Sequence, residues 1–203
     1  VDTLYLDIVG GTIDFTGKFG AGSGTIQAWD DPDIITVGDD ATGDWIIFGA
    51  GGDDEISGGS GEDTLRGEDG DDTLDGGDGI DTGQMVFDGN LVLTDTTLIG
   101  LGSDTVIAIE RFTISGGDGP NRIDASAYTL GSVTLNGGLG DDTLLGTVND
   151  DLLIGGMGND TIEQTVDADQ VLSNSSLQGM GTDTLSGFEQ AVLAGGMSDN
   201  LID

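Results

Sequence analysis

Single apolar residues recur every nine positions along much of the chain from residue 49 onward, within stretches rich in glycine and acids. Each of them is the middle residue of a three-residue segment whose first residue is usually Thr. Side chains alternate between the two faces of a strand, so the pattern predicts short strands that bury only the middle residue. The expected core residues are Leu65, Leu74, Leu144, Leu153 and Ile162.

The nine-residue segments that contain these residues fit the template G-G-x-G-x-D-x-U-x, where U is apolar. The nine positions of this template are numbered 1 to 9, so that the acid stands at position 6 and U at position 8. One run of copies covers 49–84 and a second covers 137–163, with degenerate copies at 116–124 and 195–203. The copies read GAGGDDEIS (49–57), GGSGEDTLR (58–66), GEDGDDTLD (67–75), GGDGIDTGQ (76–84), GGLGDDTLL (137–145), GTVNDDLLI (146–154) and GGMGNDTIE (155–163). A period of nine in a glycine-rich chain predicts a repeat protein rather than an ordinary globular domain.

A longer period is superimposed on the nonapeptide. The segment 58–124 aligns with 137–203 without a gap, so that Glu110 falls on Glu189 and Asn121 on Asn200. Such duplication is expected of a protein that grows by whole structural repeats. We therefore expect residues 1–48 to form strands, a cap or degenerate repeats, followed by a first cassette over 49–124 and a second over 125–203.

The remaining stretches keep part of the template. In 85–93 and 164–172, Asn90 and Asp169 take the acid position, and Val92 and Val171 take the U position. Segments 99–107 and 178–186 lack only the first Gly, and we expect small bulges at 94–98 and 173–177. Within 1–48, Leu4, Leu6 and Ile8 alternate with polar residues, while 33–35 and 44–47 look like worn repeats containing one of the two tryptophans, Trp29 and Trp45.

Charge adds a constraint that the repeat pattern does not contain. There are 39 Asp and Glu against 4 Lys and Arg, which gives a formal net charge of −35, yet 35% of the residues are hydrophobic. An acidic chain with material for a core points to external neutralisation, and hard divalent cations prefer carboxylate and carbonyl oxygens. The basic residues Lys18, Arg66, Arg111 and Arg122 are too scattered to form a patch, and phosphate would be repelled, so nucleic acid is not an expected partner.

Composition also excludes several kinds of chemistry. The chain has no Cys and no His, which rules out disulfides, thiol catalysis and ordinary zinc or haem sites. There is no apolar run long enough for a transmembrane segment. The chain opens at Val1 without the basic segment of a signal peptide and stops abruptly at Asp203, so we interpret it as a piece of a longer protein.

The nonapeptide template resembles the RTX, or haemolysin-type calcium-binding, repeat. The resemblance implies an all-β, right-handed parallel β-roll or β-helix solenoid stabilised by several calcium ions. Each ion would lie between turns two repeats apart, held by carbonyls of positions 1 and 3 of one turn, carbonyls of positions 2 and 4 of the other, and both acids. Repeat 49–57 would pair with 67–75, 58–66 with 76–84, 137–145 with 155–163, and 146–154 with 164–172.

The metal-site residues implied by the resemblance are Gly49, Gly51, Gly52, Asp54, Gly58, Gly59, Ser60, Gly61, Asp63, Gly67, Asp69, Gly70, Asp72, Gly76, Gly77, Asp78, Gly79, Asp81, Asp104, Gly137, Gly138, Leu139, Gly140, Asp142, Gly146, Val148, Asp151, Gly155, Gly156, Met157, Gly158, Asp160, Asp169 and Asp183. Glycines allow the tight turn and the crowding of carbonyls, and six oxygens at about 2.3–2.6 Å suit calcium.

Several positions depart from the template. Ala50 and Glu68 replace position-2 glycines, and Gly83 occupies a U position, so 76–84 should contribute little core. Asn121 and Asn200 replace the acid and should weaken or lose their ions, and Val148 with Asn149 puts the site of 146–154 in doubt. Glu110 and Glu189 stand at equivalent positions of the two cassettes, and their role is either a structural hydrogen bond to a loop or an extra ion.

These patterns predict a non-catalytic, calcium-binding structural module of a large secreted or cell-surface bacterial protein, such as an adhesin, surface layer or fibre. Paired carboxylates such as Asp71-Asp72 could suggest glycosidase chemistry, but the repeat accounts for them. One alternative is the calcium-folding tail of a secreted metalloprotease, lipase or epimerase. Another is an ice- or ligand-binding roll, which the broken position-7 Thr row disfavours. Calcium is the expected partner, with further copies of the chain or neighbouring repeats as others.

Overall fold

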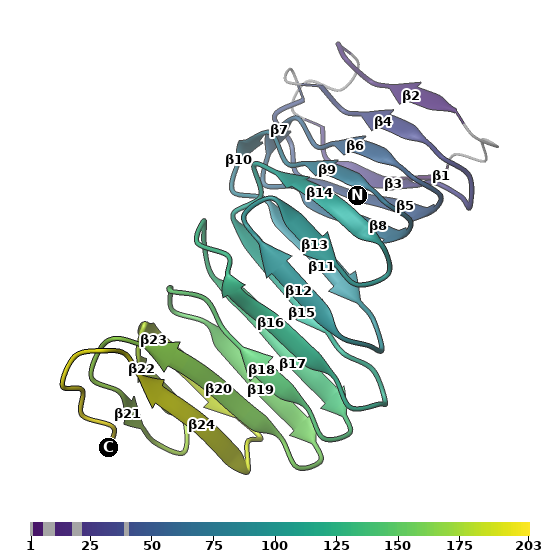
Figure 1. Cartoon of the computed structure of the whole chain (residues 1–203). Coiled ribbons are helices and arrows are strands. Elements are labelled where there is room, and N and C mark those ends of the chain that lie inside the picture. The colour runs from purple at the N-terminus through teal and green to yellow at the C-terminus, as the bar shows by residue number, and fades with distance from the viewer. Residues whose placement is uncertain (1, 6–10, 18–21, 39–40) are drawn as a thin grey trace. The chain divides into compact units, whose positions relative to one another are not determined.

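A computed structural model describes residues 2–5, 11–17, 22–38 and 41–203, and the described chain is all β (Figure 1). It contains no helix among these residues, and hence none long and apolar enough to cross a membrane. The predicted alternation through Leu6 and Ile8 and the basic residue Lys18 lie outside the described residues. The chain divides into two compact units, one of residues 1–85 and 95–112 and the other of residues 86–94 and 113–203.

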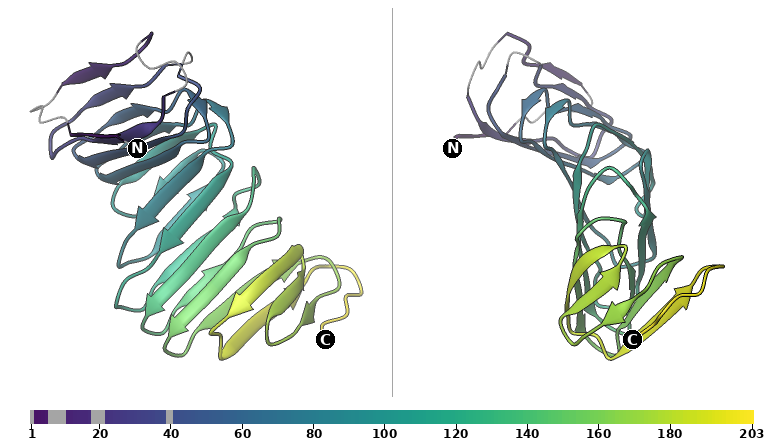
Figure 2. Two further views of the ribbon diagram at one scale, coloured as in Figure 1. Left: turned by 180° about the vertical axis from the view of Figure 1, so that it is seen from behind. Right: turned by 90° about the vertical axis from the view of Figure 1, so that its left-hand side faces the viewer.

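In the first unit, successive strands go mostly to two alternating sheets (Figure 2). One sheet has the order β1 (Asp2–Tyr5), β3 (Gly24–Gln27), β5 (Trp45–Gly51), β8 (Thr64–Asp69) and β11 (Thr82–Val86). The other has the order β2 (Thr12–Asp14), β4 (Ile34–Thr36), β6 (Glu55–Ser57), β9 (Thr73–Asp75), β14 (Ser103–Ile107) and β13 (Thr97–Ile99). Two short strands, β7 (Ser60–Gly61) and β10 (Asp78–Gly79), pair at the turns.

The second unit has the same arrangement. One sheet contains β15 (Arg111–Ser115), β17 (Val133–Leu139), β19 (Leu152–Met157), β23 (Gly181–Ser186), β22 (Ser176–Gly179) and β21 (Val171–Leu172). The other contains β12 (Leu91–Thr94), β16 (Arg122–Ala127), β18 (Thr143–Leu145), β20 (Thr161–Val166) and β24 (Gln190–Gly195). The described pairings are parallel except for those of β13 with β14 and of β22 with β21 and β23.

The strand register follows the nonapeptide. Thr64 lies opposite Thr82, Glu55 opposite Thr73, and Thr143 opposite Thr161, so neighbouring strands of a sheet are two nonapeptides apart wherever regular repeats continue. Two nonapeptides therefore make one coil with a strand in each sheet. The expected core residues Leu65, Leu74, Leu144, Leu153 and Ile162 are at most 1% exposed, which confirms their inward orientation.

The predicted register is wrong in 85–93 and 164–172. Leu91 and Gln170 are buried, whereas Val92 and Val171 are 41% and 42% exposed. Leu91 lies opposite the inward Ile123, so the inward residue comes one position earlier than the template places it. The cause is a turn between β11 and β12 that is one residue shorter than the template requires.

The pairing of 146–154 with 164–172 is also wrong. β19 pairs with β23, which places Leu153 opposite Leu185, a residue of the segment 178–186. The intervening chain forms the antiparallel strands β21 and β22, a larger excursion than the bulge predicted at 173–177. In the first unit, β13 folds back antiparallel on β14 near the bulge predicted at 94–98.

One bulky residue compensates for an irregular position in the first unit. Gly83 occupies an inward position, and a methyl group added there would collide with the ring of Phe112, which is 1% exposed. The ring thus fills the core space that Gly83 leaves. Trp45 is buried, whereas Trp29 is 51% exposed, so only Trp45 contributes its ring to the core.

Candidate metal-binding turns

The acids at position 6 are linked from turn to stacked turn by hydrogen bonds, and each such series is called a ladder here. In the first unit, the backbone N–H of Asp33 donates to Oδ1 of Asp54 at 2.8 Å, that of Asp54 to Asp72 at 2.9 Å, and that of Asp72 to Asp104 at 3.2 Å. All four side chains are buried. Each accepting carboxylate therefore fixes the turn of the preceding coil through one oxygen, independently of sheet pairing.

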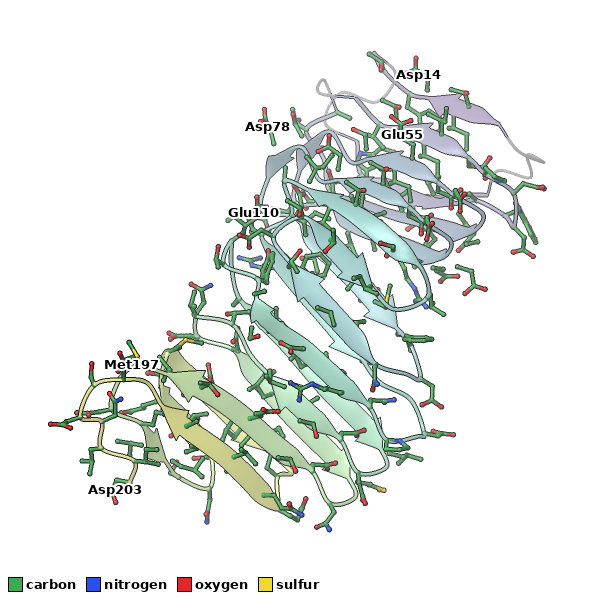
Figure 3. All side chains as sticks on the ribbon, viewed as in Figure 1. Asp14, Glu55, Asp78, Glu110, Met197 and Asp203 are labelled. Carbon is green, nitrogen blue, oxygen red and sulfur yellow. The ribbon has the colours of Figure 1, made fainter. Side chains whose placement is uncertain are left out.

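A second ladder in the first unit begins at Trp45, whose backbone N–H donates to Asp63 Oδ1 at 2.7 Å. Asp63 N–H donates to Asp81 at 2.7 Å, and Asp81 N–H donates to Glu110 Oε2 at 2.9 Å. Figure 3 labels Glu110. Glu110 follows a shortened loop in which Ala108 has a φ of 47°. The longer Glu side chain thus takes the acceptor role that Asp has elsewhere, as the predicted hydrogen bond to a loop requires.

The second unit repeats this arrangement. Asn121 N–H donates to Asp142 Oδ1, Asp142 N–H to Asp160, and Asp160 N–H to Glu189 Oε2, at 2.7–2.9 Å. In the other ladder of the second unit, the backbone N–H of Asp151 donates to Asp183 Oδ1 at 3.2 Å. Glu189 is the counterpart of Glu110 in the second cassette and accepts at the same 2.9 Å distance, so the duplication preserves the way a ladder ends.

The second carboxylate oxygen, Oδ2, of most of these acids is buried without a hydrogen-bond partner, and such an oxygen is called bare below. Among the described residues, Oδ2 is buried without a hydrogen-bond partner in Asp33, Asp54, Asp63, Asp72, Asp81, Asp104, Asp142 and Asp160. A buried polar atom without a partner costs about 1–3 kcal/mol, and more when it is charged. Eight such atoms therefore place negative charge in the interior that bound cations or protons must neutralise.

Carbonyl oxygens converge on the same points. A methyl group added to Gly58 would lie 2.6 Å from Asp63 Oδ2 and 2.8 Å from the carbonyl oxygen of Gly76, the first residue of the turn two repeats later. At Gly137, the corresponding neighbours are Asp142 Oδ2 and the Gly155 carbonyl. The nearest atoms to a position-1 glycine are therefore oxygens, which are the donors that calcium prefers.

Close stacking of the turns explains position 4. Gly79 has a φ of 148°, and a methyl group there would collide with the carbonyl of Gly61 in the paired strand. A side chain would both strain the backbone and separate the stacked carbonyls. Ala50 and Glu68 adopt the left-handed region at position 2, with φ of 81° and 77°, so these two substitutions leave the turn geometry intact.

Three of the four predicted turn pairs are brought together. The position-3 residues lie opposite one another as Gly51 with Asp69, Ser60 with Asp78, and Leu139 with Met157. Asp104 joins Asp72 through its own hydrogen bond. The remaining predicted ligands in these turns are Gly49, Gly52, Gly59, Gly67, Gly70, Gly77, Gly138, Gly140, Gly156 and Gly158. Coordination by these residues stays a prediction.

Asp169 does not take part in a ladder, contrary to the prediction. Its exposed side chain accepts the Leu201 N–H at 2.9 Å, because the register shift of 164–172 moves it to an outward position. The turn of Gly146, Val148 and Asp151 also differs from the others. Asp151 Oδ2 accepts the Thr147 N–H at 2.6 Å, so this carboxylate is satisfied within its own turn.

In the turns that carry Asn at position 6, the side-chain amide of Asn stands where other turns have a carboxylate. Asn121 Oδ1 accepts the Gly117 N–H at 3.0 Å, while its Nδ2 donates to Asp88 Oδ1 at 3.2 Å. In the second copy, Asn200 Nδ2 donates to Asp167 at 3.0 Å. The amide and an acid from the neighbouring coil thus meet each other's hydrogen-bonding needs.

Sequence reasoning missed Asp33 as a ladder member. Its turn lacks the glycines of the template, and the only signal was the D-x-U spacing of Asp33 and the buried Ile35. Trp45, not Asp44, occupies position 6 of the next worn repeat, because Ile46 lies opposite the position-7 residue Thr64. Two residues of the segment 1–48 therefore extend the ladders of the first unit. Asp33 adds an acid to the ladder of Asp54, and Trp45 adds only a backbone N–H donor to the ladder of Asp63.

Burial changes the protonation of the ladder acids. It raises the pKa of Asp54, Asp63 and Asp104 to about 7 and that of Asp81 to about 6, while hydrogen bonds from backbone N–H groups partly oppose the rise. Neighbouring acids raise these pKa values further. Without a cation, the ladders therefore hold protons at a pH where an exposed Asp is ionised.

Comparison with protein families identifies the turns. The model of the RTX calcium-binding nonapeptide repeat matches residues 48–82 and 134–162, with four copies. These are the segments that contain the bare carboxylate oxygens of Asp54, Asp63, Asp72, Asp81, Asp142 and Asp160. A comparison with curated proteins gives no significant match.

The raised pKa values predict that acid partly replaces the cation. Between about pH 4 and pH 7 the folded, calcium-free chain binds more protons than the unfolded chain, so its free energy of unfolding falls as the pH rises. In calcium-depleted buffer, circular dichroism should show more β-structure at pH 5.5 than at pH 8. Potassium chloride at pH 8, which only screens charge, should have a smaller effect. A β-signal that is constant or increases from pH 5.5 to pH 8 would contradict this account.

Adjacent acids provide a matched test of the ladder. Asp72→Asn keeps the acceptor for the Asp54 N–H but removes the charge of the bare oxygen, so it should lower calcium affinity at least tenfold in the affected turns. Asp71→Asn alters an exposed acid that accepts the Ser103 N–H at 2.9 Å, and it should change affinity less than threefold. Calcium titration calorimetry on both variants measures the difference, and equal losses would argue against the assignment.

Proposed function

Starting from the RTX calcium-binding repeats that this chain carries, we propose that it is a structural module of a larger secreted or cell-surface protein and folds when it binds calcium. The observation that carries the proposal is the set of eight buried carboxylate oxygens without a partner among the described residues, in a chain of net charge −35. Self-repulsion disfavours the compact state. Calcium bound at the turns would supply the missing counter-charge and stabilise the folded state by mass action.

RTX nonapeptide repeats bind several calcium ions. In this chain, the ladder acids and the position-1 carbonyls beside them would hold the ions, and the glycine turns would keep the carbonyls in place. When bound, calcium supplies positive charge and oxygen coordination. We further propose that the coils form a continuous right-handed solenoid. The right-handed preference of parallel crossovers supports that hand.

The calcium affinity expected of such a module indicates that it acts outside the cell. Extracellular calcium modules bind in the range of about 0.1–1 mM, far above the concentrations at which cytosolic buffers and sensors work. The chain would remain unfolded inside the cell and fold after export. RTX repeat proteins are typically secreted, which agrees with this proposal.

A non-catalytic role accounts for the acids. The buried Asp residues bind backbone N–H groups and follow one another along the turns, an arrangement that RTX repeats use for calcium rather than catalysis. We propose the cassettes 49–124 and 125–203 as the unit of extension in a spacer or fibre. Support comes from contacts at equivalent positions of the two cassettes, such as those of Asp81 with Glu110 and Asp160 with Glu189.

Calcium-driven folding is tested with the chain itself. At pH 7.5 in EGTA, circular dichroism should report a largely unfolded chain, and millimolar calcium should produce the β-spectrum cooperatively, with a midpoint of about 0.1–1 mM. Magnesium at the same concentration is the matched control and should be less effective, because it demands near-ideal octahedral geometry. A complete β-spectrum in EGTA would refute calcium-dependent folding.

A further inference from the structure

Five neighbouring strands of one sheet in the second unit carry no ionisable side chain on their outward face. The strands are β17, β19, β23, β22 and β21, and their side chains alternate between the core and the solvent. The outward residues are Thr134, Asn136, Leu152, Ile154, Val171, Ser176, Gln178, Thr182, Thr184 and Ser186, and the surface they form is called the uncharged face here. In a chain of net charge −35, such a surface is a departure that calls for a physical reason.

The uncharged face has an apolar centre with neutral polar residues on both sides. Leu152 and Ile154 lie on β19, opposite the Thr and Asn of β17 on one side and the Thr and Ser of β23 on the other. Leu152 is 38% exposed. At the ends of β17 and β19, the register partners Leu139 and Met157 are 43% and 73% exposed and extend the apolar surface. An apolar centre within a polar rim is the usual anatomy of a protein–protein interface.

The calcium-binding repeat does not require these apolar residues. Among the regular copies of the repeat, 146–154 is the only one with apolar residues at both outward strand positions, 7 and 9, and the others have Thr or Glu at position 7. The ladders use only the acids at position 6 and backbone groups. The core receives Leu153, which is 1% exposed. Leu152 and Ile154 therefore serve neither the ladders nor the core.

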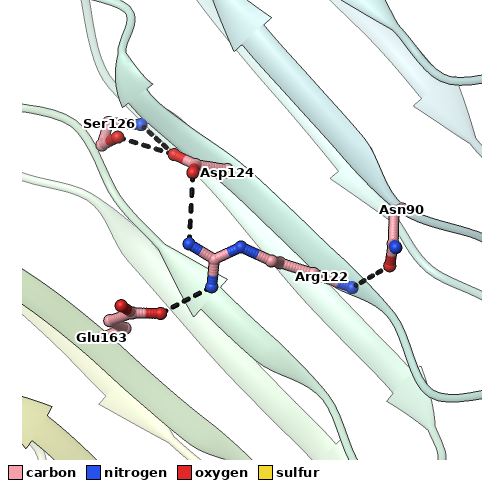
Figure 4. A network of polar contacts seen from close by, with 5 residues as sticks. All are labelled: Asn90, Arg122, Asp124, Ser126 and Glu163. Carbon is pink, nitrogen blue, oxygen red and sulfur yellow. Dashed lines mark hydrogen bonds and ion pairs between the residues drawn. The ribbon is translucent and has the colours of Figure 1, made fainter.

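The other sheet of the same unit has a charged outward face (Figure 4). The guanidinium of Arg122 on β16 pairs with Glu163 on β20 at 2.5 Å and with Asp124 on its own strand at 3.3 Å. On the intervening strand β18, the outward Leu145 is only 8% exposed. The apolar residue of that face is therefore buried within the chain, whereas Leu152 on the uncharged face remains open to a partner.

Charge decides what kind of partner fits the uncharged face. Anionic partners are repelled by the chain as a whole, and cationic ones are attracted to its acids rather than to this face. The face has no aromatic ring on which a sugar could stack. A second copy of the chain supplies a matching neutral surface. Two copies meet here with the least repulsion, because acids such as Asp141 and Asp150 lie in the turns, beyond the ends of the strands.

We infer that the uncharged face pairs with the uncharged face of a second copy of this chain. Sheets stack face to face about 10 Å apart, and a two-fold axis brings the two apolar centres together. Five short strands at the usual spacing cover about 400 Å² per copy, which lies in the range of weak contacts. Pairing is therefore weak for one chain and stronger where several cassettes act together. The inference rests on the proposed function, because the face exists only in the folded chain, and it names a partner for that module.

Sedimentation equilibrium of the full chain in millimolar calcium tests the pairing, from about 10 µM to about 1 mM protein, as a contact of this size requires. The weight-average mass should rise with concentration toward that of two chains. Leu152→Lys puts a charge at the apolar centre and should weaken pairing at least about tenfold, although it lowers the net negative charge. Val92→Lys, at a 41% exposed position of β12 on the other sheet, is the matched control and should change pairing less than about threefold.

Circular dichroism on the same samples separates the pairing from the proposed function. A chain that gains no β-structure in calcium refutes the proposed function and the pairing together. A folded chain that stays monomeric throughout this range refutes the pairing alone, and its retention on a neutral polysaccharide matrix would assign the face to a glycan instead. Equal mass curves for the unaltered chain and Leu152→Lys would place the contact elsewhere and overturn the inference. Should Leu152→Lys fail to fold, Thr184→Lys on the adjacent strand β23 decides by the same criterion.

Discussion

The position-6 carboxylate is the group on which the other features of the turns depend. One of its oxygens accepts the backbone N–H of the equivalent residue in the preceding coil, as between Asp54 and Asp72. This bond fixes the spacing of the turns and holds the whole carboxylate in a buried position. Its other oxygen is left beside stacked carbonyls, as Asp63 Oδ2 is beside Gly76. The bond that aligns the coils therefore also creates the unsatisfied charge.

This dual role explains why the fold needs an external cation. The apolar core is thin, with essentially one inward residue in each regular three-residue strand, and burial of Leu65 or Leu144 must offset both chain entropy and the desolvated acids. Protonation removes the charge of the carboxylate but supplies no ligand for the carbonyl oxygen beside it. A divalent cation attracts the carboxylate and the carbonyl dipole together.

The regular repeats could be predicted from the sequence because a nine-residue turn and strand form a local unit. The inward orientation of Leu65 and Leu74 follows from that unit alone, whereas the turn pairs of 49–84 were implied by the resemblance to the RTX repeat. The sequence could not predict that Leu91 points inward, because Val92 is equally apolar and only the pairing with Ile123 decides. The stacking of 146–154 on 178–186 likewise depends on long-range pairing. Asp33 was recognisable by spacing but lacked the glycine signal.

The claim that calcium neutralises the buried ladders is tested most directly by anomalous diffraction from crystals of the calcium-loaded chain. The account predicts peaks between stacked turns, about 2.3–2.6 Å from the bare Oδ2 atoms of Asp54, Asp63 and Asp142. Peaks found only at exposed position-5 acids such as Asp53, Asp71 and Asp141, with no density beside the buried oxygens, would contradict it.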